Sequence, residues 1–109
     1  MESRKLKMDE ILDYMDGPII FSALDEEHHY YICSFATSTK ENTTFLCTLG
    51  IPEVTSNLTN GEIDLLEFIQ HQDSTHFSLT FPNDDDMAKS ITREEIKGWL
   101  PLPGYYVNQ

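Results

Sequence analysis

The sequence predicts an α+β domain: a mainly antiparallel sheet of about four to five strands, with short helices packed on one face. Apolar residues alternate with period two in several segments between residues 18 and 81, as they do on strands of a sheet. Helix-start signals precede short apolar segments at Pro52 and Asp64. The length of 109 residues fits a single domain covering residues 1–109.

The first predicted element is a helix near the N-terminus. The i, i+3, i+4, i+7 spacing of one helical face is met by Met8, Ile11, Leu12 and Met15. Gly17 and Pro18 follow, and both residues favour the end of a helix. The acidic residues in between would line its solvated side.

Three strands are predicted next, over residues 18–24, 28–36 and 43–50. Their odd-numbered positions are expected to face the core: Ile19, Phe21, Ala23, Tyr31, Cys33, Phe35, Phe45, Cys47 and Leu49. The even-numbered positions are too apolar to be wholly solvated, so we expect another part of the chain to cover some of them. A hairpin register would place Cys33 opposite Cys47, and we expect both to be buried, reduced thiols.

The second half of the chain predicts two short helices, one strand and an apolar tail. The helices are expected over 52–60, ending at Gly61, and from Asp64, with Asp64 as N-cap. A clean alternation predicts a strand over 74–81, with His76 on its wet face. An exposed acidic loop over 82–86 is expected to precede a helix that begins at Thr92, stops near Gly98 and leads into the tail over 99–107.

Charge is the main constraint on partners. The formal net charge is −12, and sixteen acidic residues but only one basic residue, Lys40, lie between Met8 and Ala88. Such a field repels phosphate backbones and anionic membranes and attracts basic protein surfaces. We therefore expect a protein partner with a basic surface, no direct nucleic-acid contact and no membrane contact. The candidate partner-binding residues are Asp9, Glu10, Asp13, Asp16, Asp25, Glu26, Glu27, Asp84, Asp85, Asp86, Trp99 and Tyr105.

No catalytic, metal or cofactor site is expected. The histidines lack metal-ligand spacing, and His28 and His29 would point to opposite faces of a strand. Glycine-rich phosphate loops and nucleophile motifs are absent from the sequence. The spacing of Lys89, Arg93 and Lys97 would place them on one helix face, where pairing with nearby acids is the simpler interpretation.

Three short motifs suggest a relationship. They are Asp-Tyr-Met-Asp-Gly-Pro-Ile-Ile-Phe at 13–21, Gly-Glu-Ile-Asp-Leu at 61–65 and Leu-Pro-Leu-Pro-Gly at 100–104. Together they resemble a family of small bacterial and phage domains of unknown function. The resemblance implies a compact α+β domain of bacterial or phage origin and supplies no catalytic residues.

These observations favour a non-catalytic, cytoplasmic protein-binding module. Its concrete form is an inhibitor or immunity-type protein that blocks the basic surface of a nucleic-acid-handling partner, and its sharpest form is a mimic of DNA in phage–host conflict. In a second interpretation the acidity serves only solubility, and the chain is an accessory subunit or a homodimer formed through the apolar even face. A third interpretation, a small-molecule-binding or enzymatic domain, requires a pocket with convergent polar groups.

Overall fold

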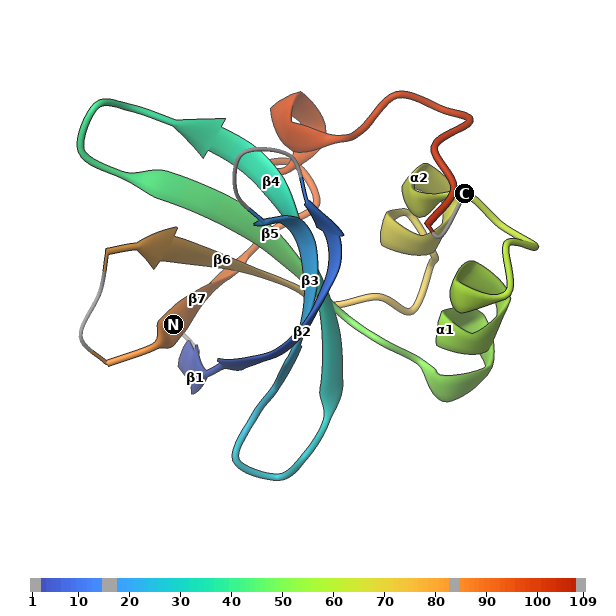
Figure 1. The fold of residues 1–109 in the computed structure, drawn as a ribbon, viewed down its shortest axis with the longest axis horizontal. Coiled ribbons are helices and arrows are strands. Elements are labelled where there is room, and N and C mark those ends of the chain that lie inside the picture. The colour runs from blue at the N-terminus through green and yellow to red at the C-terminus, as the bar shows by residue number, and fades with distance from the viewer. Residues whose placement is uncertain (1–2, 15–17, 83–84, 108–109) are drawn as a thin grey trace.

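The fold is mostly β: seven antiparallel strands form one curled, half-barrel sheet, and two short helices pack beside it (Figure 1). A computed structural model describes residues 3–14, 18–82 and 85–107. The strands are β1 (Ser3–Lys5), β2 (Lys7–Tyr14), β3 (Pro18–Leu24), β4 (Tyr30–Ser38), β5 (Thr43–Leu49), β6 (His76–Phe81) and β7 (Met87–Ile91). The helices are α1 (Pro52–Thr59), α2 (Leu65–Ile69) and a 3-10 turn at Lys97–Trp99. The α+β expectation therefore holds broadly, but the predicted four to five strands undercount the sheet.

The curl brings the two edges of the sheet together at Leu6. The strand order is β1-β7-β6-β5-β4-β3-β2, so β1 and β2 lie at opposite edges although a single residue separates them. Leu6 is buried among the side chains inside the curl, and its N–H donates to the carbonyl of Asp86 at 2.8 Å. One bent N-terminal segment thus pairs first with β7, through β1, and then with β3, through β2.

The predicted N-terminal helix is wrong, because residues 7–14 form strand β2. The pairing of β2 with β3 shifts register between Met8 and Glu10 and again between Ile11 and Asp13. Each shift adds a residue to β2, so Met8 and Ile11 share a face although they are three positions apart. This bulged strand reproduces helical spacing. The predicted helix end at Met15, Asp16 and Gly17 lies outside the described residues.

The inside of the curl holds the first core, as the odd-numbered alternation predicted for most of its members. It buries Leu6, Phe21, Ala23, Tyr31, Cys33, Phe45, Cys47, Phe77, Leu79 and Ala88. Cys33 lies opposite Cys47 on the neighbouring strand, and both are free, buried thiols. Two odd-numbered residues depart from the prediction: Ile19 packs against the second core, and Phe35 is 45% exposed at the end of this face.

The outside of the sheet packs on a second core, which α1, α2 and the C-terminal tail cover. Its buried members are Ile20, Ile32, Leu46, Leu58, Leu65, Phe68, Ile69, Ile96 and Val107. The expectation that something covers the even-numbered face is confirmed. Three of the residues that a homodimer through this face would use, Ile20, Ile32 and Leu46, are buried under the chain's own helices and tail.

Residues that begin and end helices α1 and α2 explain how the second half of the chain covers the outer face of the sheet. Pro52 opens α1, and Gly61, with φ of 76°, follows its end. Asp64 caps α2 by accepting from the Glu67 N–H at 2.8 Å, and its other oxygen accepts from the Gly104 N–H at 2.8 Å. The Leu65 N–H donates to the Tyr105 carbonyl, also at 2.8 Å. The start of α2 therefore holds the tail against the domain.

Two further predictions need correction. His76 begins β6 but is only 2% exposed, because the face predicted to be wet is covered by the second core. Thr92 accepts from the Glu95 N–H, as a helix cap would, but the segment forms turns and the short 3-10 helix. Lys89 lies on β7 and Lys97 in that 3-10 helix, so these residues and Arg93 do not share a helix face.

Candidate functional site

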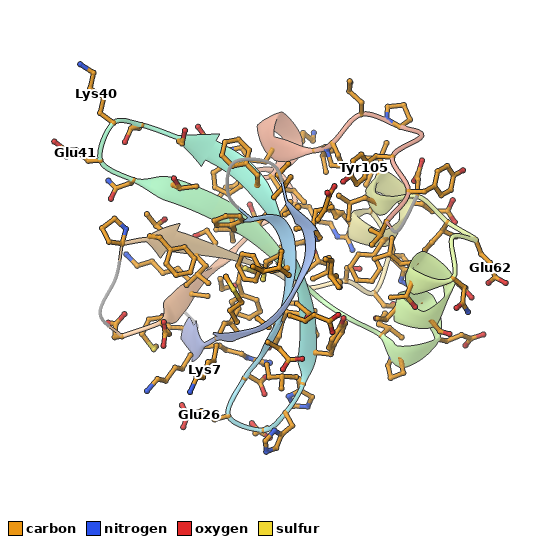
Figure 2. The ribbon with its side chains drawn as sticks, viewed as in Figure 1. Lys7, Glu26, Lys40, Glu41, Glu62 and Tyr105 are labelled. Atoms are coloured by element: carbon orange, nitrogen blue, oxygen red, sulfur yellow. The ribbon has the colours of Figure 1, made fainter. Side chains whose placement is uncertain are left out.

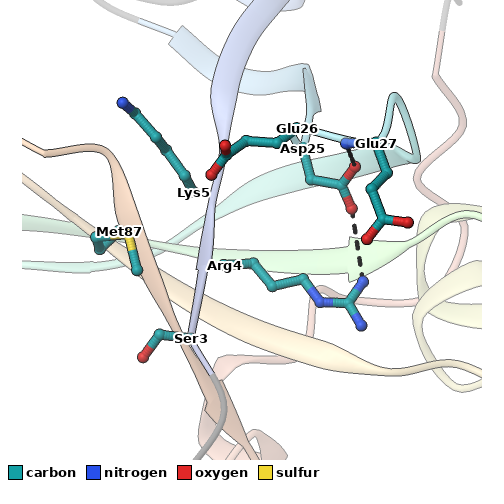
Figure 3. A pocket seen from close by; sticks show the side chains of 7 residues that line it. All are labelled: Ser3, Arg4, Lys5, Asp25, Glu26, Glu27 and Met87. Atoms are coloured by element: carbon teal, nitrogen blue, oxygen red, sulfur yellow. Dashed lines mark hydrogen bonds and ion pairs between the residues drawn. The ribbon is translucent and has the colours of Figure 1, made fainter.

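The turn between β3 and β4 is built around the buried carboxylate of Asp25 (Figure 3). Its Oδ1 accepts from the backbone N–H groups of Glu27 and His29, each at 2.9 Å. Its Oδ2 accepts from the Tyr31 hydroxyl at 2.9 Å and lies 3.0 Å from Nδ1 of His29. These contacts fix the turn that leads from one strand into the next.

Arg4 of β1 joins the turn to the opposite edge of the sheet. Its Nη1 donates to the Tyr31 hydroxyl at 2.8 Å and lies 3.5 Å from Oδ2 of Asp25. The guanidinium carbon also lies 5.3 Å from the ring centre of Phe77, within cation–π range. The Arg4–Tyr31–Asp25 network thus connects β1 with β4 and the β3–β4 turn.

The network shifts the pKa of both acidic partners. Burial raises the pKa of Asp25, but the hydrogen bonds from His29, Tyr31 and Glu27 outweigh burial and lower that pKa to about 2. Burial is also the main reason why the pKa of Tyr31 rises to about 12, against the opposing effect of Arg4. Asp25 therefore stays a carboxylate and Tyr31 a phenol at neutral pH, so neither suits general acid–base catalysis there.

Around this network lies a surface hollow of ≈ 330 Å³ lined by Ser3, Arg4, Lys5, Asp25, Glu26, Glu27 and Met87 (Figure 3). Its lining mixes both signs of charge. Arg4 and Asp25 already contact each other at its wall, so the hollow presents chiefly the exposed side chains of Lys5, Glu26 and Glu27.

The second candidate feature is strand β2, which lies at the sheet edge with residues 7–11 exposed. Glu10 pairs with Ser22, and Asp13 pairs with Ile20, a member of the second core, so both acids belong to the outer side. Burial, aided by the charges of Glu10 and Asp9, raises the pKa of Tyr30, which packs against the second core. The outer side of this edge therefore carries the acids Glu10 and Asp13, together with Lys7, which pairs with Leu24, and Leu12, which packs against the second core.

The other side of the same edge is apolar. Met8 pairs with Ala23 and Ile11 pairs with Phe21, both of which belong to the first core. Met8 and Ile11 are nevertheless 41% and 45% exposed, because β2 has no further strand beside it within residues 3–14, 18–82 and 85–107. Two apolar side chains that pair with first-core residues are thus exposed to solvent along β2.

The predicted partner-binding residues fall into three groups. Side chains of Asp9, Glu10, Glu26, Glu27 and Asp85 are exposed, and those of Asp13 and Asp86 are half-buried. Asp25 is buried and uses its carboxylate inside the turn, while Trp99 and Tyr105 pack against the second core. Asp16 and Asp84 lie outside the described residues.

Two polar residues have roles that the sequence did not indicate. Buried His76 places Nε2 2.8 Å from the Ile69 carbonyl, and burial is the main cause of its lowered pKa. Arg93 donates through Nη2 to three carbonyls of the α2–β6 loop, those of His71, Gln72 and Ser74. The sequence could not indicate the Arg93 contacts, because they join residues about twenty positions apart and involve backbone carbonyls, which every residue has.

Metal and ligand sites find little support in the described part of the chain. No group of three or more His, Cys, Asp or Glu residues there could hold a metal ion. Other surface hollows of ≈ 160 to ≈ 410 Å³ lie beside Tyr105, α2 and the His28–His29 turn, and the one at α2 is lined by Asp64, Leu66, Glu67, Gln70 and His71. None of the described helices has the length and apolar character needed to cross a membrane.

Comparisons with known proteins add no relative. No protein-family model matches the chain, and searches of curated proteins and of solved structures gave no match either. The resemblance to small bacterial and phage domains therefore stays an expectation.

Proposed function

We propose that this chain is a non-catalytic, cytoplasmic module that binds the basic surface of a partner protein and blocks it. A protein that handles nucleic acid is the partner class that best fits, because its working surface is basic. The observation that supports this proposal is the presence of exposed carboxylates on β2 and in the β3–β4 turn, in a chain of net charge −12.

These carboxylates are not neutralised within the fold. Asp9, Glu10, Glu26 and Glu27 are exposed, and no ion pair joins any of them to another residue of the described ranges. Unpaired surface charge of one sign raises the encounter rate with an oppositely charged protein. The described fold thus leaves these groups available for a partner's lysines and arginines.

The spread of the acids favours capture of a basic protein over imitation of a DNA strand. Glu26, Glu41 and Glu62 lie at three separate extremities of the molecule (Figure 2). A mimic of DNA needs its carboxylates in one array, with spacing like that of phosphates. We therefore propose local capture at the β2 edge, with the remaining acids adding long-range attraction.

Two charge-matched variants test this proposal. The edge variant carries Asp9→Asn, Glu10→Gln and Asp13→Asn, and the control carries Glu41→Gln, Glu62→Gln and Asp73→Asn. Both change the net charge from −12 to −9. The measurement is co-purification of host proteins with the tagged chain at 0.1 M and 0.5 M salt, quantified by mass spectrometry.

A specific basic partner should be recovered by the unmodified chain and by the control at low salt, and lost at high salt because ions screen the attraction. The edge variant should recover less than about a tenth as much, since each tenfold loss needs only about 1.4 kcal/mol. Equal recovery by both variants would refute capture at the β2 edge, and recovery of no basic protein by the unmodified chain would support the interpretation in which the acidity serves solubility alone.

A further inference from the structure

We propose that the open edge of β2 binds its partner by strand addition, and that the added segment alternates basic and apolar residues. This inference rests on the proposed function and names the partner's recognition element. An exposed sheet edge offers unpaired backbone N–H and C=O groups to another extended chain. Within the described ranges, β2 pairs with β3 on one side and with no strand on the other.

The required alternation follows from the two sides of β2. An added strand places successive side chains on opposite faces of the sheet. On the outer side it would meet the carboxylates of Glu10 and Asp13, and on the inner side it would meet Met8 and Ile11. Basic residues therefore fit one set of positions and apolar residues the other, because cross-strand neighbours of opposite charge or shared apolarity stabilise a sheet.

The apolar side of the edge continues into an aromatic cluster. The Phe21 and Phe45 ring centres are 4.9 Å apart, and those of Phe35 and Phe45 are 6.3 Å apart, with both pairs edge to face. Phe35 and Ile11 are each 45% exposed on this inner side. Apolar side chains of an added segment would extend this cluster and shield Ile11 from water.

A second copy of this chain is a poor occupant of the same edge. Antiparallel pairing of two β2 strands would bring the acidic residues Asp9, Glu10 and Asp13 of one copy against those of the other, with Lys7 as the only cation on each strand. Like charges opposite one another destabilise a strand pair. The charge instead selects a basic partner.

Two synthetic octapeptides test the inference. The probe alternates lysine and valine, and the control has the same composition, with four lysines followed by four valines. Both carry the same charge and differ only in pattern. Affinity is measured by fluorescence anisotropy in 50 mM salt, and the position of binding by backbone amide shifts of the isotope-labelled full chain.

The alternating peptide should bind at least tenfold more tightly than the block peptide and shift amide signals of β2 and β3. Ile11→Ser should weaken the alternating peptide about fivefold, whereas Leu102→Ser should not, because Leu102 is 83% exposed in the tail. Both substitutions sit on the surface, and the unbound amide spectrum verifies that each variant is folded.

Equal affinity for the two peptides, shifts confined to other acidic surfaces, or failure of both peptides to bind would each overturn strand addition. None of these results decides the acidic-capture proposal, which depends on the matched charge variants and on recovery of a basic host protein. The two hypotheses can therefore fail separately.

Discussion

Replacing Asp25 by asparagine should destabilise the protein by an amount that depends on pH. Asparagine keeps the size of the side chain but removes the charge that accepts hydrogen bonds from the Glu27 and His29 N–H groups and the Tyr31 hydroxyl. The pKa of Asp25 falls from 3.8 to about 2 on folding. At 1.36 kcal/mol per pKa unit, this linkage corresponds to about 2 kcal/mol at neutral pH.

The sign follows from the lowered pKa. Between pH 3.8 and about pH 2, Asp25 is protonated in the unfolded chain but still ionised in the folded chain. The stabilisation is therefore complete above the unfolded pKa and is lost as the pH falls through the folded pKa. The advantage of the unmodified chain over Asp25→Asn should be about 2 kcal/mol at pH 6 and about 1 kcal/mol at pH 3. In thermal unfolding, the neutral-pH difference corresponds to a Tm loss of roughly 8 °C.

Urea unfolding at several pH values between 3 and 7 measures this difference, and Glu27→Gln is the matched control. Glu27 lies in the same turn and carries the same charge, but its side chain is exposed. The control should change the free energy of unfolding by less than about 0.5 kcal/mol. The reasoning is refuted if Asp25→Asn costs no more than Glu27→Gln, or if its cost is the same at pH 3 and pH 6.

Three further predictions concern the buried polar groups. Because burial lowers the pKa of His76, stability should fall as the pH drops below the unfolded value of 6.5, and His76→Gln should flatten urea-unfolding free energies measured between pH 7 and pH 5. Arg93→Ala should cost roughly 1 to 3 kcal/mol by removing hydrogen bonds to three carbonyls; amide hydrogen exchange in residues 70–75 should rise, while exchange in β4 stays unchanged. Cys33 and Cys47 should resist a thiol reagent in the native protein, since burial raises the pKa of Cys33, and both should react in urea; a fast native reaction of either thiol would contradict the packing.

The alternation of residues predicted the central strands, because successive side chains of a strand point to opposite faces of the sheet. Phe21, Cys33 and Cys47 occupy the inner core as their spacing indicated, and the register that pairs the two cysteines is the one observed. The N-terminal strand escaped detection for a physical reason. An added residue between Met8 and Ile11 turns a period of two into a spacing of three, which a sequence pattern cannot distinguish from a helix.

The site was less predictable than the fold, because it depends on contacts between distant parts of the chain. Asp25 reads as one of three exposed turn acids, and only the approach of Arg4 and Tyr31 reveals it as a buried hydrogen-bond acceptor. His76 reads as solvated until α2 and the tail cover its face. The open edge of β2 could not be foreseen, since the strand itself was assigned to a helix.

The bent segment around Leu6 also constrains the order of folding. Ser3 pairs with Lys89 and Arg4 with Ala88, so β1 finds its neighbour only after the chain has been made as far as β7. Strands β2 to β5 can instead form hairpins with near neighbours in sequence. Contacts that close long loops form slowly, because the chain loses conformational entropy on closing the loop before it gains the free energy of the contacts. During synthesis on the ribosome, β1 would emerge long before its partner β7, and until β7 is available the inner core would stay open where Leu6 later seals it.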